Sequence, residues 1–576
     1  MSVPTSASLL RLVIHSAALA IPVLFAFNAY SEPTVTVISP KGGATGGSPV
    51  FYEAFATSPG CDKGIAAMRI YSAPGVDAFD VDGAHIETFI PLSPGDYSTT
   101  VQAWDNCGGV GKTAVPLTVS DKAGVSVYLP TQGAAYWPVH VAASAESPEC
   151  SAGISAIRIY AAPGVSPYTI DANKLDAYVT LPPGNHNLTV QAWDNCGNVF
   201  KYPLAESVFS SSDAYLYASG TGSIAEIEIN SDGSLRNPNG SGSPPEFSAQ
   251  SASVLAVDPG GWFVYATSDA GIYGFQIDRS NGALVAMPGS PFRFNIDQLG
   301  DQGPPTILMD PAGNFVYVGY HGGGGGAATA GVATYRIERS SGELTWTGFA
   351  LYFGSESSGF GGLDSPTTDS TGRYFYCSCG KPTLQLRGYA VNANNGFLTA
   401  APGSPFQFVG SPMSTGKYLY LGATKNPSEG DVLGLAVNYS NGTVTQLPGS
   451  PFSAGSPGWP ITPLWADWQS RFLWGLEFQN QTAASNGLQA FTINSSTGAV
   501  APSGSFMNFP LLLFFDLVED HSGKYVFTGM TRNGSNSGPD LASWSIAPDG
   551  TWKEINSLDI SSGVVSSIAV APKNPQ

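Results

Sequence analysis

Few side chains in the long C-terminal part of the chain could carry out acid–base chemistry. Only two histidines follow residue 210. His321 follows an expected strand and opens a run of five glycines, and Glu477 lies between two apolar neighbours just past another expected strand. Hydrolysis of an ester needs a base that activates water and a donor or cation for the developing anion. We therefore take His321 and Glu477 as candidate acid–base groups, with Arg293 or Arg532 stabilising the anion.

The remaining chemically distinctive residues point to weaker sites. His521 lies inside an Asp-x-x-Gly turn, where we expect a neutral structural or surface role. Trp459, between Gly and Pro in an expected loop, is a candidate for stacking on a carbohydrate. Cys377 and Cys379 should face the same side of a strand, as a disulfide or as two buried thiols.

Local motifs for metal, phosphate or nucleophilic chemistry do not occur in the sequence. It contains no Gly-x-Ser-x-Gly, no His-Glu-x-x-His and no phosphate loop ending in Gly-Lys-Ser/Thr. We accordingly expect neither a metal nor a cofactor. The few cations in the expected ligand-face loops argue against a phosphate-specific pocket.

The composition predicts a turn-rich, all-β protein. Of 576 residues only 12% are charged, while Gly and Pro number 69 and 44, which does not suit long charged helices. The hydrophobic fraction of 43% is enough for folded cores. The 24 basic and 43 acidic residues give a net charge of −19. Binding to nucleic acid needs a basic face, and none is visible, so we expect no nucleic-acid partner. An anionic membrane surface is disfavoured for the same reason.

The N-terminus predicts export. Arg11 precedes an apolar run from Leu12 to Phe27, and Ala29-Tyr30-Ser31 offers a cleavage site, so residues 1–31 read as a signal peptide. The run is short for a membrane span, and an uncleaved anchor is the alternative. We expect an extracytoplasmic monomer (periplasmic, secreted or on the cell surface) with no stable membrane insertion after cleavage.

Two copies of one module follow the signal peptide. Residues 61–107 align with 150–196 at an offset of 89 without a gap, and 23 of 47 positions are identical. Short alternating strands between Pro-Gly turns predict a β-sandwich for each copy. A cysteine at either end of each copy predicts one disulfide per module in an exported protein. The expected pairs are Cys61 with Cys107 and Cys150 with Cys196.

Both modules contain the same three sequence motifs, which are Arg-Ile-Tyr, Ala-Pro-Gly-Val and Val-Gln-Ala-Trp-Asp-Asn-Cys-Gly. With this pattern, residues 32–121 and 122–209 resemble two bacterial immunoglobulin-like domains. The resemblance implies a spacer or adhesion role and supplies no catalytic residues.

A second repeat begins near residue 210. Seven times, a turn related to Asp-Pro-x-Gly precedes an aromatic strand, as in Asp258–Tyr265 and Asp310–Tyr317. Each unit later has a Gly-centred hairpin, such as Asn281-Gly282, whose glycine supplies a positive φ. Seven units with room for four strands predict a seven-bladed β-propeller over 210–576. We expect the spare strand Ser566–Ala571 to complete the first blade and latch the ring.

The propeller segment resembles the seven-bladed lactonase family. The resemblance rests on Asp-Pro-x-Gly-x-Phe-Val-Tyr, on Gly-Ala-Leu, and on Pro-Gly-Ser-Pro-Phe at 288–292, 402–406 and 448–452. That family includes 6-phosphogluconolactonase-like and carboxymuconate-cyclase-like proteins, and the resemblance implies a carboxylic ester hydrolase that opens a lactone. Because these motifs build blades, they indicate fold more directly than activity.

Two functions therefore stay open for an exported, lactonase-like propeller. One is a non-catalytic module that binds a glycan or a protein, and the other is a hydrolase that opens a sugar-derived ring ester by general-base catalysis. The scarcity of titratable residues and the tandem sandwiches place binding slightly ahead. The expected partner is a glycan, a protein or a small lactone.

Overall fold

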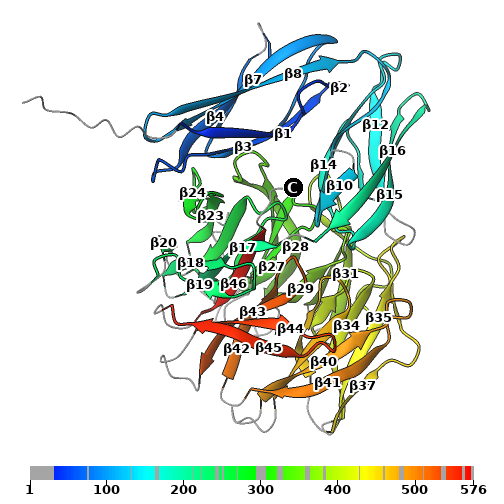
Figure 1. Ribbon diagram of the computed structural model, residues 1–576. Coiled ribbons are helices and arrows are strands. Elements are labelled where there is room, and N and C mark those ends of the chain that lie inside the picture. The colour runs from blue at the N-terminus through cyan, green and yellow to red at the C-terminus, as the bar shows by residue number, and fades with distance from the viewer. Residues whose placement is uncertain are drawn as a thin grey trace, which may run out of the picture.

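The computed structural model shows an all-β chain, as the composition predicted. Every regular element in the described residues is a strand, and none of these residues forms a helix long and apolar enough to cross a membrane. Two β-sandwiches lie over one end of a β-propeller (Figure 1). The described residues are 32–73, 77–130, 133–161, 168–210, 212–220, 222–240, 245–249, 252–268, 270–293, 306–320, 328–356, 363–379, 385–426, 429–457, 461–478, 486–509, 512–532, 540–560 and 565–572.

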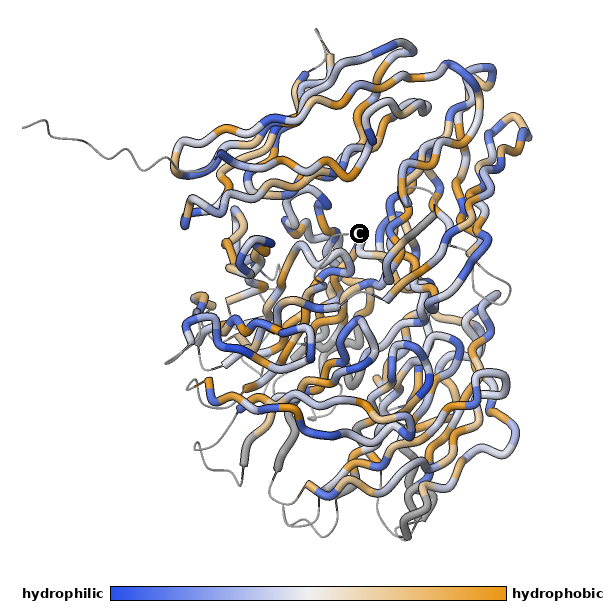
Figure 2. The backbone as a smooth tube through the Cα atoms, viewed as in Figure 1, coloured by the Kyte–Doolittle hydropathy of each residue, from blue (hydrophilic) through white to orange (hydrophobic). Residues whose placement is uncertain are grey.

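The first sandwich packs a three-stranded sheet against a five-stranded one. Tyr52, Met68 and Val101, all buried, belong to its single core, and hydrophobic and hydrophilic residues alternate along its strands (Figure 2). The predicted disulfide Cys61–Cys107 is present. The sheets are β1 (Thr34–Ser39), β3 (Val50–Thr57), β6 (His85–Ile90); and β2 (Ala44–Gly46), β8 (Val110–Val119), β7 (Gly95–Asp105), β4 (Ile65–Tyr71), β5 (Phe79–Asp82).

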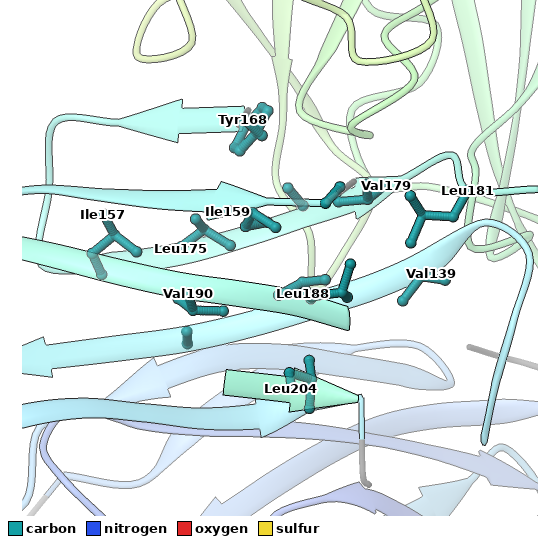
Figure 3. Close-up of a cluster of buried hydrophobic side chains, with 14 of the residues drawn as sticks. Val139, Ile157, Ile159, Tyr168, Leu175, Val179, Leu181, Leu188, Val190 and Leu204 are labelled. Atoms are coloured by element: carbon teal, nitrogen blue, oxygen red, sulfur yellow. The ribbon is translucent and has the colours of Figure 1, made fainter. Parts of the chain in front are cut away.

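The second sandwich repeats this arrangement. Its core includes Val139, Ile159 and Leu188 (Figure 3), and its predicted disulfide Cys150–Cys196 is also present. The sheets are β9 (Gly124–Leu129), β11 (Val139–Glu146), β14 (Lys174–Val179); and β10 (Gly133–Tyr136), β16 (Val199–Phe209), β15 (Gly184–Asp194), β12 (Ile154–Tyr160), β13 (Tyr168–Ile170).

The described residues from 213 to 572 form seven antiparallel sheets, each built on a path of four strands. The strands of each sheet are given from the innermost outward. Sheet 1 consists of β46 (Ser567–Pro572), β17 (Asp213–Ser219), β18 (Ser223–Ile229) and β19 (Leu235–Arg236), with β20 (Glu246–Ser248) beside β18; sheet 2 consists of β21 (Leu255–Val257), β22 (Phe263–Ser268), β23 (Gly271–Ile277) and β24 (Leu284–Ala286). Sheet 3 consists of β25 (Thr306–Met309), β26 (Phe315–Tyr320), β27 (Ala328–Ile337) and β28 (Leu344–Glu356); sheet 4 consists of β29 (Leu363–Thr368), β30 (Tyr374–Cys379), β31 (Gln385–Val391) and β32 (Leu398–Ala400). Within β30, Cys377 and Cys379 are joined as a disulfide.

Sheets 5 to 7 continue the same plan. Sheet 5 consists of β33 (Pro412–Ser414), β34 (Tyr418–Asn426), β35 (Glu429–Val437) and β36 (Val444–Gln446), with β37 (Phe452–Pro457) beside β35. Sheet 6 consists of β38 (Ile461–Ala466), β39 (Phe472–Phe478), β40 (Asn486–Ile493) and β41 (Val500–Asn508). Sheet 7 consists of β42 (Leu512–Glu519), β43 (Tyr525–Arg532), β44 (Leu541–Ile546) and β45 (Trp552–Leu558).

The C-terminal strand pairs with the first sheet, as predicted. Strand β46 runs antiparallel to β17, with Val570 opposite Leu216. Buried hydrophobic clusters then link each sheet to the next, and one cluster joins Phe527 of sheet 7 to Leu216 and Ile568 of sheet 1. The hydrophobic contacts therefore follow a closed order from sheet 1 back to sheet 1.

Hydrogen bonds join the aromatic strand of one sheet to the Gly-centred hairpin of the next sheet. The hydroxyl of Tyr265, in the aromatic strand of sheet 2, donates to the carbonyl of the hairpin residue Gly342 of sheet 3 at 2.7 Å. Sheets 1, 3, 4 and 5 use a tyrosine in the same way, and sheet 6 uses Trp474, whose indole donates to Gly550. Each bond is buried, so the aromatic residue both packs and ties one sheet to the next.

The aspartates of the repeat organise the turns between the first and second strands of the sheets. In sheet 2 the Asp258 carboxylate accepts the backbone N–H groups of Trp262 and Phe263, both at 2.6 Å. Gly261 closes that turn with a φ of 65°, a left-handed conformation that favours glycine. We call the edge of the propeller that carries these turns the turn side, and the opposite edge the loop side.

The sandwiches pack directly on the turn side. Tyr178 of β14 donates its backbone N–H to the carbonyl of Ala312 in the turn of sheet 3 at 3.1 Å. The side chain of Thr180 donates to Ser370 in the turn of sheet 4. In the first sandwich the backbone N–H of Ala84 donates to Gln276 at 3.0 Å. The tandem modules are thus fastened to the propeller and do not project from it as a free stalk.

Candidate functional site

The structure places the predicted site residues on the loop side, with two outside its description. Glu477 lies near the end of β39, and Arg532 is the last residue of β43. Both strands are the second of their sheets and begin at the turn side, so both residues lie at the loop side of neighbouring sheets 6 and 7. Arg293 follows Phe292, which bridges Ile272 at the start of β23, and is exposed. His321 and Trp459 lie outside the described residues.

A cavity of about 390 Å³ lies at the opposite, turn-side end of the central channel. The innermost strands β21, β33, β38, β42 and β46 supply its apolar walls, from Leu255 to Val570. Trp137 of the second sandwich covers one side, and the polar residues Glu519 and His521 of sheet 7 face it. We call this cavity the channel pocket.

His521 brings a histidine–carboxylate pair to the channel pocket. Its Nδ1 lies 2.6 Å from Oδ1 of Asp213, and its backbone N–H donates to Oδ2 of the same residue at 2.8 Å. Asp213 is buried, whereas the side chain of His521 keeps 17% of its exposure and so remains reachable by water. The pair leaves Nε2 as the ring nitrogen not bound to Asp213.

Electrostatics at this pair favour the protonated imidazole. Burial lowers the pKa of His521, but the charge and hydrogen bond of Asp213 outweigh that effect and raise the pKa above its usual value. The aspartate also fixes the ring, because a carboxylate beside Nδ1 keeps the Nδ1–H tautomer. Nε2 can then take up a proton from a second partner once the imidazole is neutral.

Glu519 brings a buried carboxyl group to the same pocket. Burial, together with the nearby Asp467 carboxyl, raises the pKa of Glu519 well above its usual range. Its Oε2 accepts the backbone N–H of Trp468 at 2.9 Å, and Nη2 of Arg471 lies 3.4 Å from Oε1. A carboxyl group with a raised pKa can carry a proton and then donate a hydrogen bond to a substrate oxygen.

Aromatic rings line the pocket beside these groups. The rings of Trp137 and Trp468 stack with centroids 4.1 Å apart, and the His521 ring lies 5.1 Å from Trp137. Trp465, on innermost strand β38, adds a third indole to the lining. Flat apolar rings near polar groups suit a small ring-shaped ligand.

Sequence reasoning missed this constellation. The turn motif around His521 suggested a structural or surface residue, because the motif carries no sign of a partner. That partner, Asp213, lies 308 positions away at the start of β17, and pairing it with the seventh sheet requires the ring to close. The expected spare C-terminal strand was the one available signal, since it brings sheet 7 next to sheet 1.

Comparisons with known proteins give low similarity. No protein-family model and no curated protein matches the chain. A periplasmic gluconolactonase of Pseudomonas aeruginosa is 17% identical, covers 63% of this chain and 99% of its own, and has a TM-score of 0.45. A 6-phosphogluconolactonase-like structure from Bacteroides fragilis is 15% identical over 62% and 98%, with a TM-score of 0.44. Fibronectin(III)-like modules of Clostridium thermocellum are 17% identical over 31% and 93%, with a TM-score of 0.14. The similar solved structures thus include lactonase-like β-propellers at low identity.

Proposed function

We propose that the chain is an exported, lactonase-like β-propeller protein that opens a small cyclic ester in the channel pocket. The observation that carries the proposal is the pair of His521 and Asp213 in the same cavity as the carboxyl of Glu519, whose pKa is raised. A catalytic pocket is expected to gather a histidine or carboxylates with shifted pKa values around the channel, whereas a pure binding surface is not.

Each group has a role in the reaction. With its Nδ1–H held by Asp213, neutral His521 takes a proton from water at Nε2, and the water oxygen bonds to the ester carbonyl carbon. Glu519 donates a hydrogen bond to the carbonyl oxygen as negative charge develops on it. The ring C–O bond then breaks, and the leaving oxygen takes the proton from the His521 imidazolium. The product is a hydroxy acid, which releases its proton to solvent.

The docking of the sandwiches fits an enzyme better than a stalk. Trp137, from the second sandwich, forms part of the pocket wall, so the pocket is complete only when that sandwich is in place. A spacer would have no reason to supply a side chain to the cavity. The disulfides of both sandwiches are consistent with an oxidising, extracytoplasmic location.

Glycan binding is the second candidate, and the aromatic lining of the channel pocket favours it. Trp137, Trp465 and Trp468 offer indole surface to a sugar ring. A binding protein with this pocket would bind a monosaccharide and release it unchanged. A sugar lactone would satisfy both candidates as a ligand, so only turnover distinguishes them.

The test is a pH-stat assay of the full chain against aldonolactones and simple γ- and δ-lactones. We expect saturable acid release by the wild type, at least about 100-fold slower with His521→Gln, because a general base contributes roughly that factor or more. Glu519→Gln should be slower as well. His186→Gln is the matched control, since His186 lies exposed in the second sandwich and contacts Pro182.

Each outcome decides between the candidates. Turnover lost with His521→Gln and kept with His186→Gln supports hydrolysis in the channel pocket. Turnover that both variants retain contradicts the assigned residues. Binding of an aldonolactone in calorimetry without acid release above the spontaneous rate favours the glycan-binding candidate.

A further inference from the structure

A second cluster of titratable side chains lies where both sandwiches meet the propeller. The first sandwich contributes Glu53 from β3 and His85 and Glu87 from β6, all buried. The second sandwich contributes His140 and Asp176, and the propeller contributes Arg339, which follows β27. This cluster has no part in the channel pocket, and the inference below does not depend on the proposed hydrolysis.

Strand register explains why three donors of the first sandwich converge. Glu53 lies directly opposite Glu87 in the antiparallel pairing of β3 with β6. His85 precedes Glu87 by two positions, so both side chains leave β6 on the same face. The indole of Trp262 stacks on the His85 ring at 3.9 Å and holds its orientation.

The donors sit too far apart for good hydrogen bonds and at a suitable spacing for a metal ion. Nε2 of His85 lies 3.6 Å from Oε1 of Glu53 and 3.6 Å from Oε2 of Glu87. One donor atom from each of the three residues lies within 4.8 Å of the others. Tetrahedral ligands about 2.0–2.1 Å from a zinc ion are separated from each other by about 3.4 Å.

Buried polar atoms at this point lack hydrogen bonds. Among the described residues, both carboxylate oxygens of Glu53 and both ring nitrogens of His85 are buried without a hydrogen-bond partner. Oε2 of Glu53 lies 3.2 Å from Nδ1 of His140, whereas Oε1 of Glu53 and Nε2 of His85 stay 3.6 Å apart. Coordination to a cation is one arrangement that would satisfy these buried atoms.

Charged side chains of the second sandwich and of the propeller surround these ligands. Arg339 contacts Glu87 at 3.0 Å and Asp176 at 3.4 Å. His140 lies between two carboxylates, with Nδ1 3.2 Å from Oε2 of Glu53 and Nε2 2.7 Å from Oδ1 of Asp176.

We propose that Glu53, His85 and Glu87 bind a divalent transition-metal ion, with Zn²⁺ as the best-fitting ion. One imidazole nitrogen and two carboxylate oxygens form a ligand set that zinc accepts, with a fourth position for water or His140. Arg339 holds Glu87 in place from the propeller, as outer partners commonly orient ligands. The ion would stabilise the junction between the first sandwich and the propeller.

The test uses the untagged full chain, loaded with zinc sulfate and dialysed into metal-free buffer. We expect about one zinc per chain by inductively coupled plasma mass spectrometry, and a melting temperature several degrees lower after a chelator removes it. His85→Ala should lose the zinc and the response to chelator. His186→Ala, which removes an exposed histidine of the second sandwich, should keep both.

Glu53→Gln keeps the proposal testable if His85→Ala does not fold. It removes one ligand charge with little change of shape and should weaken zinc retention at least tenfold, the size of effect seen when a coordination sphere is disturbed. Folded wild-type chain that retains no zinc, and whose melting temperature zinc does not change, would overturn the site. Retention that is equal in the wild type, His85→Ala and Glu53→Gln would overturn it too.

Discussion

Replacing Asp213 by Asn should change the pH dependence of activity and of stability in opposite senses. In the wild type, Asp213 raises the pKa of His521 through a contact of 2.6 Å between Nδ1 and Oδ1. Asn has nearly the same shape but carries no charge, and its single oxygen can accept the Nδ1–H bond or the backbone N–H of His521, not both. The substitution therefore removes the electrostatic stabilisation of the imidazolium together with one hydrogen bond of the turn.

Coulomb's law sets the size of the effect. Two unit charges about 4 Å apart interact by about 4 kcal/mol at an effective dielectric constant of about 20. Burial of the ring opposes this attraction, so only part of it stabilises the imidazolium, and removing the charge of Asp213 should lower the pKa of His521.

The sign follows from which protonation state each property needs. The base must be neutral, so kcat/KM of the wild type should rise as pH rises through the raised pKa of His521. The ion pair needs the charged ring, so its stabilisation is complete below the unfolded pKa of about 6.5 and is lost as pH rises through the folded pKa. In Asp213→Asn the activity profile should move to lower pH, and this fall in stability above about pH 6.5 should disappear.

Two measurements check the reasoning. The pH dependence of kcat/KM with a stable lactone gives the activity midpoint, and thermal unfolding between pH 5 and 9 gives the stability change. An activity profile that is identical in the wild type and Asp213→Asn would show that His521 does not act as the base. An unchanged stability profile would show that the pair does not hold sheet 1 to sheet 7.

Other substitutions test the fold that supports the site. Tyr420→Phe removes a buried hydrogen bond to the next sheet and should lower the free energy of unfolding by about 1–3 kcal/mol in urea denaturation, whereas Tyr418→Phe, whose hydroxyl makes a longer contact of 3.4 Å, should cost less. Serine at both Cys61 and Cys107 opens a loop of 46 residues and should destabilise the first sandwich by about 4 kcal/mol, measured by thermal unfolding with and without reductant. Deleting residues 565–576 removes β46 and exposes an edge of β17, so soluble yield and melting temperature should both fall; an unchanged melting transition would refute the latch.

The turns, hairpins and disulfides that depend on residues close in sequence could be predicted, whereas the channel pocket and the cluster around His85 could not. The Asp258 turn and the Gly282 hairpin are specified by residues a few positions apart, so their repetition predicted the number of units and their strands. The cysteine spacing likewise predicted Cys61–Cys107. In each case the partners lie within one module or one turn, and the chemistry of the turn or disulfide leaves few alternatives.

The candidate sites depend instead on contacts between distant parts of the chain. His521 meets Asp213 only because the first and seventh sheets are neighbours, and Trp137 reaches the pocket only because the second sandwich docks on the turn side. The cluster around His85 lies where the first sandwich, the second sandwich and the propeller meet, and no spacing in the sequence indicates it. The predicted Glu477 and Arg532 do share the loop side, since strand direction is a local property of each unit.

The most direct test of the account is the rate of acid release from glucono-δ-lactone by the wild type and by His521→Gln, measured in parallel at pH 8 with the spontaneous rate subtracted. We expect saturable turnover by the wild type and a rate at least about 100-fold lower in the variant, the contribution expected of a general base. Equal rates in the two proteins, or no wild-type rate above the spontaneous one on this and the other lactones, would contradict hydrolysis in the channel pocket.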